Sequence, residues 1–323
     1  MELDIKDKKI LVELIKNSRT PIKQIAKKVG MSREVVNYRI NQLVKKGIIK
    51  EFYTEINETL LGFERFGCAV QLKGISEKKE REFMEKIAKN PYITYFGPII
   101  GKWNFAFDII LKSKEELEKI LSELFSDYKE KIKQYIINSA PIDRGFFPAK
   151  IFGSNFKEKI FKKKKIELTK KDFEILEILR NNSRVEYIEL SRKLNLTGNA
   201  IKYRIKNMEN LGIIYSYTIA IDYAKLGYDF YNLQIKFSDY DFSKLKKFLV
   251  ESKKVKYFYK HLGNPDWDLD IGLVVKNSLE LREFLIEIKN VFEENMEIHD
   301  VFLIPYAIKE NIAPEGIFDS KNL

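Results

Sequence analysis

The sequence predicts an α+β protein in which two winged helix-turn-helix domains alternate with two ferredoxin-like (βαββαβ) domains. Two similar stretches, Met31–Ile49 and Leu196–Ile214, first indicate this fold. Each has as its second residue a hydroxyl residue that can cap a helix, Ser32 or Thr197, carries Tyr-Arg-Ile in mid-helix and ends in Gly-Ile-Ile. The order of strand and helix patterns after each stretch is the third observation. We therefore interpret the chain as a tandem repeat that forms a pseudo-dimer within itself.

A constant offset relates the two copies over their first part. An offset of 165 residues aligns Leu3 with Leu168, Asp7 with Asp172, Asn17-Ser18-Arg19 with Asn182-Ser183-Arg184, and Leu61-Gly62 with Leu226-Gly227. Further along, a slightly smaller offset aligns Gly101 with Gly263 and Asp108 with Asp270. The predicted domains are therefore residues 1–58, 59–153, 167–223 and 224–319, with a basic linker at 154–166.

Composition narrows the classes of partner and site. The formal net charge of +11 favours a polyanionic partner, although a lysine-rich surface also serves solubility. One cysteine and two histidines are too few for a Cys/His zinc site, and no metal site or in-chain disulfide is expected. We find no amino-terminal signal segment and no apolar run of about 18 residues, so the expected location is the cytoplasm.

Three short helices are predicted at the start of each copy. In copy one, apolar residues at helical spacing follow Asp4, a second helix begins at Thr20-Pro21 and stops at Gly30, and Ser32 opens the third. Helix, helix, turn and helix is the scaffold of many DNA-binding domains. After Gly47 the pattern alternates, and we interpret these segments of both copies as the strands of a wing.

The third helix has one apolar side and one polar side. Val36, Ile40 and Leu43 cluster on the side expected to pack on the other helices. Polar side chains that can pair with base edges, interleaved with cations, fill the opposite side, as a major-groove helix requires. A plain solvated face is the alternative, and repetition of the pattern favours DNA. The predicted DNA-binding residues are Ser32, Arg33, Glu34, Asn37, Tyr38, Arg39, Asn41 and Lys45, with Thr197, Asn199, Lys202, Tyr203, Arg204 and Lys206 in copy two.

Two arginines of this set lie nearer the packed flank of their helices. We expect Arg39 and Arg204 to pair with an acid of the first helix, such as Asp7 or Asp172, or with a phosphate, rather than to read a base.

The rest of each copy predicts strand, helix, strand, strand, helix, strand. The ranges are 66–72, 77–89, 93–100, 103–111, 114–129 and 132–140 in copy one, and 231–237, 241–252, 256–262, 267–275, 278–295 and 299–305 in copy two. This order places both helices on one face of an antiparallel sheet. We assign Ala69, Phe107, Ile109, Leu233, Ile235 and Leu273 to the other face, where a partner sheet would cover them.

Taken together, these motifs resemble the Lrp/AsnC family of feast/famine regulators, twice over. The resemblance rests on the acids before Ile10-Leu11, on Arg19, Arg39, Gly47-Ile48-Ile49 and Leu61-Gly62, and on their counterparts in copy two. It implies that the helix-turn-helix domains bind operator double-stranded DNA. It also implies that the ferredoxin-like domains are similar to the family's regulatory (RAM) domain, which pairs sheet to sheet and can bind a small effector, typically an amino acid.

The resemblance places the effector near the turn between the second and third strands, which in the family reads Gly-x-x-Asp. The effector residues it implies are Gly101 and Asn104 in copy one and Gly263 and Asp266 in copy two. An aspartate can hold an ammonium group by a charge-assisted hydrogen bond, more strongly than Asn104 can. The alternative is that Asp or Asn caps its own turn. No cofactor other than such an effector is expected.

The tandem arrangement departs from the family's usual single copy. Linkage makes the two regulatory sheets mutual partners, so one chain forms an intrachain pseudo-dimer with two unlike recognition helices. Arg33 and Asn37 of one helix correspond to Gly198 and Lys202 of the other, so the half-sites are expected to differ. Further homo-oligomerisation stays open at this stage.

Two rival functions are weighed against a regulator. The first rival is an enzyme, because sirohaem decarboxylases resemble this fold and use histidines in their active sites. Here only His261 lies near the turn between the second and third strands, and copy one has no corresponding histidine. We therefore expect no enzyme. An architectural protein that binds DNA without sequence choice is the second rival. The operator, the effector, the sign of regulation and the oligomeric state are not encoded in any pattern we find.

Overall fold

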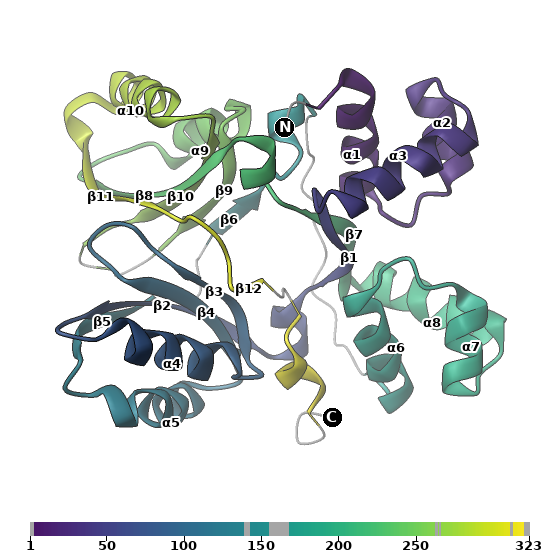
Figure 1. The fold of residues 1–323 in the computed structure, drawn as a ribbon, viewed down its shortest axis with the longest axis horizontal. Coiled ribbons are helices and arrows are strands. Elements are labelled where there is room, and N and C mark those ends of the chain that lie inside the picture. Colours follow the sequence, from purple (N-terminus) through teal and green to yellow (C-terminus); the bar gives the residue numbers. More distant parts are fainter. Residues whose placement is uncertain are drawn as a thin grey trace. The chain divides into compact units, whose positions relative to one another are not determined.

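The computed structural model describes residues 3–138, 143–154, 168–261, 264, 266–310 and 313–319. The chain divides into two compact units, one of residues 1–62, 154–226 and 312–323 and the other of residues 63–153 and 227–311. The first unit holds the helix-turn-helix parts of both copies, and the second holds both ferredoxin-like parts (Figure 1). The predicted fold class is confirmed, because equivalent parts of the two copies associate within each unit.

The first unit contains three helices and a strand from each copy, each helix started by a local cap. Asp4 accepts a hydrogen bond from the Asp7 backbone N–H, and Thr169 forms a capping box with Asp172. Gly30 ends the second helix of copy one with φ of 67°. The elements are α1 (Ile5–Lys16), α2 (Ile22–Val29), α3 (Arg33–Lys45) and β1 (Ile49–Ile56), then α6 (Lys170–Asn181), α7 (Tyr187–Leu194), α8 (Gly198–Leu211) and β7 (Ile214–Ile221).

The sequence pattern suggested that the strands after the recognition helices form a wing within each copy. The structure shows that they do not. β1 pairs antiparallel with β7 instead, in a two-stranded sheet shared by the two copies. Most of β7 is buried, and so are Tyr53, Thr54 and Ile56 of β1. The apolar residues that alternate along these strands therefore join the two helix-turn-helix domains.

Reciprocal contacts reinforce this pairing. The Ser18 backbone N–H donates to the Tyr217 carbonyl, and the Ser183 N–H donates to the Phe52 carbonyl, both at 2.9 Å. α1 lies against β7, and α6 lies against β1. Each first helix thus packs on the strand of the other copy, which fixes α3 and α8 within one unit.

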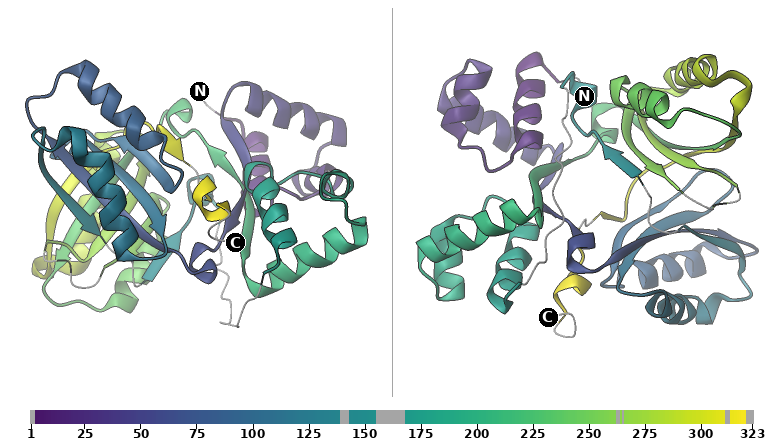
Figure 2. Two further views of the ribbon diagram at one scale, coloured as in Figure 1. Left: turned by 90° about the horizontal axis from the view of Figure 1, so that it is seen from below. Right: turned by 180° about the vertical axis from the view of Figure 1, so that it is seen from behind.

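The second unit contains two antiparallel sheets, each with two helices on its outer face (Figure 2). The elements of copy one are β2 (Glu64–Leu72), α4 (Glu77–Ala88), β3 (Ile93–Pro98), β4 (Phe105–Leu111), α5 (Lys114–Phe125) and β5 (Ile132–Asn138). Those of copy two are β8 (Asp229–Phe237), α9 (Phe242–Glu251), β9 (Val255–Lys260), β10 (Leu269–Val275), α10 (Ser278–Phe292) and β11 (Met296–Leu303). Short 3-10 turns add η2 (Ser126–Tyr128), η3 (Lys150–Phe152) and η5 (Glu293–Asn295) to this unit, and η1 (Glu58–Leu61), η4 (Ala224–Leu226) and η6 (Glu315–Phe318) to the first.

The two sheets exchange a strand, which the sequence did not indicate. β6 (Asp143–Phe146), near the end of copy one, pairs with β9, and β12 (Lys309–Glu310), near the end of copy two, pairs with β3. Each exchanged segment brings a lysine that caps a helix of the other copy. Lys150 Nζ donates to the Leu249 carbonyl at 3.0 Å, and Lys309 Nζ donates to the Ala88 carbonyl at 3.1 Å.

The large apolar side chains of the sheets face their own helices, contrary to the predicted face assignment. Phe107 and Ile109 belong to the core between the copy-one sheet and its helices. The positions equivalent to Leu233 and Ile235, Cys68 and Val70, lie in the same core. Between the sheets lie Ile99 and Trp103 of copy one and Phe302 and Ile304 of copy two, with Ala69 packed against them. Tyr95, Ile136 and Phe230 of the strands also pack against this cluster, so large side chains fill the layer between the sheets.

Within the described residues, no helix is both long and apolar enough to cross a membrane.

Candidate nucleic-acid interface

The outer sides of α3 and α8 present the residues that the sequence assigned to DNA. Tyr38 is 64% exposed and Tyr203 is 74% exposed, whereas Val36 and Ile201, on the inner sides, are fully buried. The exposed set on α3 and its cap is Ser32, Arg33, Glu34, Asn37, Asn41 and Lys45, and on α8 and its cap it is Thr197, Asn199, Lys202 and Lys206. The helical periodicity therefore places these side chains on one outward face of each helix.

Arg39 and Arg204 pair with acids of the first helix, which confirms the expectation for them. Arg39 Nη1 donates to Asp4 Oδ2 at 2.7 Å and to Asp7 Oδ1 at 2.8 Å. Arg204 Nη1 donates to Asp172 Oδ1 and to Thr169 Oγ1, both at 2.9 Å. Each arginine therefore ties its recognition helix to the start of the first helix of the same copy.

Arg39 and the carboxylates that it contacts stabilise each other's charged forms. A hydrogen bond from the Asp7 N–H, followed by one from Arg39, lowers the pKa of Asp4, and the two carboxylates raise the pKa of Arg39. Arg39 thus remains a cation, and the carboxylates of Asp4 and Asp7 balance its charge. Attraction of DNA phosphates therefore depends on other cations.

The hydroxyl residues at the start of the recognition helices act as caps. Ser32 Oγ accepts from the Val35 N–H at 3.3 Å, and Thr197 Oγ1 accepts from the Ala200 N–H at 3.2 Å. Hydrogen bonds to the Glu34 N–H and to Ser32 lower the pKa of the exposed Glu34 carboxyl, which keeps it ionised. A carboxylate there can accept from a cytosine amino group but is repelled by phosphate.

Sequence reasoning missed the cations of the second helices. Lys23 and Lys27 of α2 and Arg192 of α7 are exposed. In helix-turn-helix proteins the helix before the recognition helix crosses the DNA backbone, so cations on it suit phosphate contacts. The lysines of the α2 segment, Ile22–Val29, were the available signal.

In the two predicted effector turns, the structure pairs the residues of the two copies differently from the sequence alignment. Asn104 Oδ1 accepts from the Leu72 N–H at 2.8 Å, and Asp268 Oδ2 accepts from the Phe237 N–H at 2.8 Å. Because Leu72 and Phe237 occupy equivalent strand positions, the counterpart of Asn104 is Asp268, two residues beyond the aligned Asp266. Asn104 and Asp268 thus each bond to a neighbouring strand, whereas the alternative interpretation had Asn104 cap its own turn.

The other predicted effector residues lie in different environments. Asp266 is exposed, and its backbone N–H donates to Asn264 Oδ1 at 2.9 Å. Gly101 has φ of 159° and lies so close to Phe302 that a Cβ there would be 3.0 Å from the phenylalanine Cβ. Gly263 lies outside the described residues. Effector binding at these turns stays a prediction.

His261 lies in a buried polar cluster. Its Nε2 is 2.7 Å from Asp270 Oδ2, and Trp267 Nε1 donates to the same oxygen at 3.1 Å. Cys68 is also buried, and burial raises the pKa of its thiol above the usual range. Within the described part of the chain, no group of three or more His, Cys, Asp or Glu residues is placed to hold a metal ion.

Comparison with known proteins shows the same fold and domain type. A family model described as "Winged helix-turn-helix DNA-binding" matches residues 3–50 and 168–215. An uncharacterized HTH-type transcriptional regulator of Pyrococcus furiosus is 33% identical over 132 residues, which is 39% of this chain and 85% of the relative. The HTH-type transcriptional regulator LrpB of Bacillus subtilis is 34% identical over 94 residues, 29% of this chain and 63% of the relative.

Two solved structures of a siroheme decarboxylase are similar over nearly the whole tandem chain. The crystal structure of the siroheme decarboxylase NirDL matches with a TM-score of 0.65 and 15% identity, covering 94% of this chain and 92% of that one. At this level of identity the match shows a shared fold.

Proposed function

The chain is a DNA-binding transcriptional regulator of the Lrp/AsnC family, built as a tandem duplication, and from this premise we propose that one chain reads two unlike half-sites of an operator. The observation that carries the proposal is the β1–β7 pairing, which joins two helix-turn-helix domains of different sequence in one unit. A one-copy dimer presents identical helices, whereas this chain presents α3 and α8 together.

The two helices offer different chemistry to the major groove. α3 begins with Arg33-Glu34 and carries Asn37, a set that suits guanine, cytosine and adenine edges. α8 begins with Gly198 and carries Lys202 at the position of Asn37. Fewer base-reading groups on α8 favour a less specific half-site there, with the lysine available for guanine or phosphate.

Selection of operators from a random DNA pool tests the proposal. The expected consensus has two different halves bound by one chain, and exchanging Asn37 and Lys202 between the helices should exchange the preferences of the halves. A symmetric consensus bound by one chain, or no enrichment of any sequence, contradicts it. Equal affinity for unrelated duplexes with a steep salt dependence would instead identify an architectural DNA-binding protein.

A small amino-acid effector is part of this proposal. The Asp266 carboxylate is exposed and has no hydrogen bond or ion pair among the described residues, so it is available to an ammonium group. Isothermal titration with each of the common amino acids, on the wild-type chain and on Asp266→Asn, tests this role. Binding that survives the substitution would place the effector elsewhere.

A decarboxylase is the second candidate, and the fold shared with the siroheme decarboxylase is the observation in its favour. Proton transfer near neutral pH would fall to His261 or to His299, whose ring centre lies 5.3 Å from that of Trp267 beside the same Asp270 carboxylate. His261 is buried and already bonded to Asp270, and copy one has no histidine, so we propose no enzymatic activity. A change in the absorption spectrum of sirohaem during incubation with the chain would contradict this.

A further inference from the structure

Each sheet of the second unit ends in a short exchanged strand on one side and in a strand of seven or eight residues on the other. The exchanged strands β12 and β6 cover β3 and β9, whereas β5 and β11 are the terminal strands at the opposite ends. An open terminal strand leaves alternate backbone N–H and C=O groups without strand partners, and proteins usually protect such edges. The two open edges are therefore places where another strand can add.

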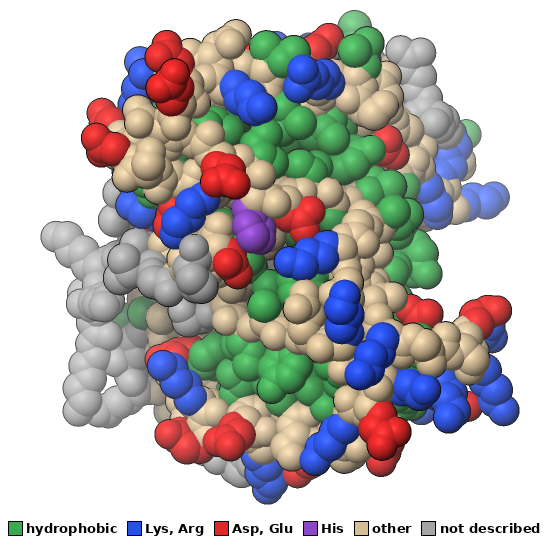
Figure 3. Space-filling view, turned by 90° about the vertical axis from the view of Figure 1, so that its left-hand side faces the viewer, with side chains coloured by type: hydrophobic (Ala, Val, Ile, Leu, Met, Phe, Trp, Pro, Cys, Tyr) green, Lys and Arg blue, Asp and Glu red, His purple; other side chains and the backbone are tan. Residues whose placement is uncertain are grey.

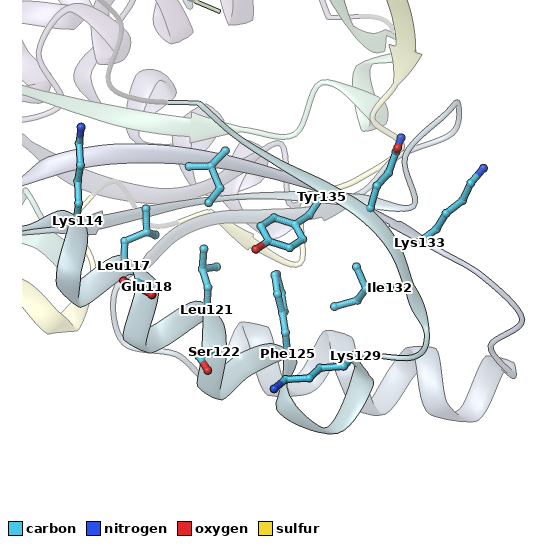
Figure 4. Close-up of a pocket in the computed structure, with 12 residues that line it drawn as sticks. Lys114, Leu117, Glu118, Leu121, Ser122, Phe125, Lys129, Ile132, Lys133 and Tyr135 are labelled. Atoms are coloured by element: carbon cyan, nitrogen blue, oxygen red, sulfur yellow. The ribbon is translucent and has the colours of Figure 1, made fainter.

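An apolar groove runs beside the open edge of copy one. It has a volume of about 730 Å³ and lies between α5 and β5 (Figure 4). Leu117, Leu121 and Phe125 of α5 form one wall. Tyr135 and Ile137 of β5 form the other and are 46% and 41% exposed, which is high for large apolar residues. A strand added to β5 would insert alternate side chains into this groove.

Lysines stand at both ends of the groove. Lys114 lies at one end and Lys129 and Lys133 lie at the other (Figure 4). These three lysines form no hydrogen bond or ion pair within the residues that the structure describes. Glu118 is the one acidic residue among those that line the groove, so the groove has a cationic rim that suits an acidic strand in either direction.

The open edge of copy two has the complementary charge. In copy two, residues 293–304 form the turn and β11, and they carry Glu293, Glu294, Glu297 and Asp300 but neither lysine nor arginine. The equivalent residues of copy one, 127–138, carry three lysines and two acids. Ile298, Val301 and Leu303 of β11 are half-exposed, and Ile286 of α10 beside it is 42% exposed. Figure 3 shows two separate apolar patches on the face of the molecule that carries both halves of this unit.

We propose that β5 and its groove bind β11 of a second copy of this chain. Lysines on an edge strand often serve only to keep edges apart. Here they repel the β5 edge of another copy and attract its β11 edge, while two β11 edges repel each other through their glutamates. Because the two halves of the chain have diverged in charge, the pairing is directional, which identical halves could not achieve. Both edges belong to one unit, so two chains related by a two-fold axis make the contact twice and close.

Sedimentation velocity of the full-length chain over a range of concentrations tests the proposal. The wild type should associate beyond one chain, more weakly at high salt. A Lys129→Glu/Lys133→Glu variant has two acidic edges, and a Glu293→Lys/Glu294→Lys/Glu297→Lys variant has two basic edges. Each alone should associate about tenfold or more weakly, and mixing the two should restore association, since both acidic edges of one variant then meet basic edges of the other.

Two controls keep the test sharp. Lys78→Glu/Lys79→Glu makes the same charge change on exposed α4 positions and should leave association unchanged. Affinity for a selected operator half-site, measured below the association concentration, reports on the first unit and separates this proposal from the proposed function. A wild-type chain that stays single at every concentration overturns the proposal. So does association that is unaffected by the Lys129/Lys133 substitutions.

Discussion

The hydroxyl oxygens of Ser18 and Ser183 lie 2.6 Å apart in the interior of the first unit, although the two residues are 165 positions apart in sequence. Both serines are fully buried. Around them the contacts repeat in pairs: the Arg19 guanidinium lies 5.3 Å from the Tyr217 ring centre, and that of Arg184 lies 5.1 Å from the Phe52 ring centre. The serine pair therefore marks the local pseudo-two-fold axis of the joined helix-turn-helix domains.

The first prediction concerns this serine pair. Ser18→Ala should lower the free energy of unfolding by about 1–2 kcal/mol, because it leaves the buried Ser183 hydroxyl without its partner. Adding Ser183→Ala should cost less than the second substitution costs alone, since no unpaired hydroxyl remains. A double-mutant cycle by urea unfolding, followed by circular dichroism, measures the coupling. Strictly additive losses would show that the two hydroxyls do not depend on each other.

The second prediction separates two roles for the recognition-helix arginines. If Arg204 acts by holding α8 to Asp172, then Arg204→Ala and Asp172→Asn should both lower stability, by about 1–2 kcal/mol, and both weaken operator binding. If Arg204 binds a phosphate, Asp172→Asn would leave DNA affinity unchanged or raise it, because it frees the cation. Fluorescence anisotropy with a labelled operator, combined with urea unfolding, distinguishes the outcomes. Arg39 with Asp7 provides the same comparison in copy one.

The recognition helices were predictable from sequence because their evidence is local. A period of 3.6 residues sorts Val36, Ile40 and Leu43 from Tyr38 and Asn41 without knowledge of any other element. The Arg39 and Arg204 ion pairs were also predictable, since the repeat placed an acid at the start of the first helix each time. The faces of the recognition helices depend on neighbouring residues alone, whereas the ion pairs join residues 32 positions apart and were predictable only from the repeat.

The pairing of strands was not predictable, because alternation of apolar and polar residues identifies a strand but does not indicate which strand pairs with it. The β1 pattern suits a wing hairpin as well as it suits pairing with β7, and only the packing of α1 on β7 decides. The two-residue β12 and the four-residue β6 are too short to produce a pattern at all. The face assignment of Phe107 failed because both faces of its strand are covered, and the larger side chains went to the helices.

The third prediction concerns the exposed tyrosines of the reading face. Tyr38→Ala and Tyr203→Ala should each weaken binding to a selected operator by about 1–3 kcal/mol, while binding to an unrelated duplex changes little. Stability should be unchanged, because both rings are mostly exposed. Tyr306→Ala, which removes a ring 60% exposed in the second unit, is the matched control. Unchanged operator affinity in both variants would remove these tyrosines from the interface.

The last prediction follows from the lysine that the exchanged segment of copy one buries. Lys150 is 5% exposed, and its ammonium donates to the Leu249 and Val250 carbonyls at the end of α9. Burial lowers the pKa of Lys150 from 10.5 to about 8, against a smaller opposite effect of Glu251. The folded chain therefore binds this proton less tightly than the unfolded chain does. Relative to Lys150→Met, the wild type should gain stability as pH rises from about 8 toward 10.5.

The size and control of this effect can be stated in advance. The wild type should gain about 1–3 kcal/mol over Lys150→Met between pH 7 and pH 10, measured by urea unfolding at each pH. Lys247→Met removes an exposed lysine from the same helix α9 and should follow the wild type. Parallel pH curves for the wild type and Lys150→Met would mean that Lys150 keeps an ordinary pKa in the folded chain. The exchanged segment would then be held by its other contacts, such as the 2.9 Å ion pair between Asp143 and Lys246.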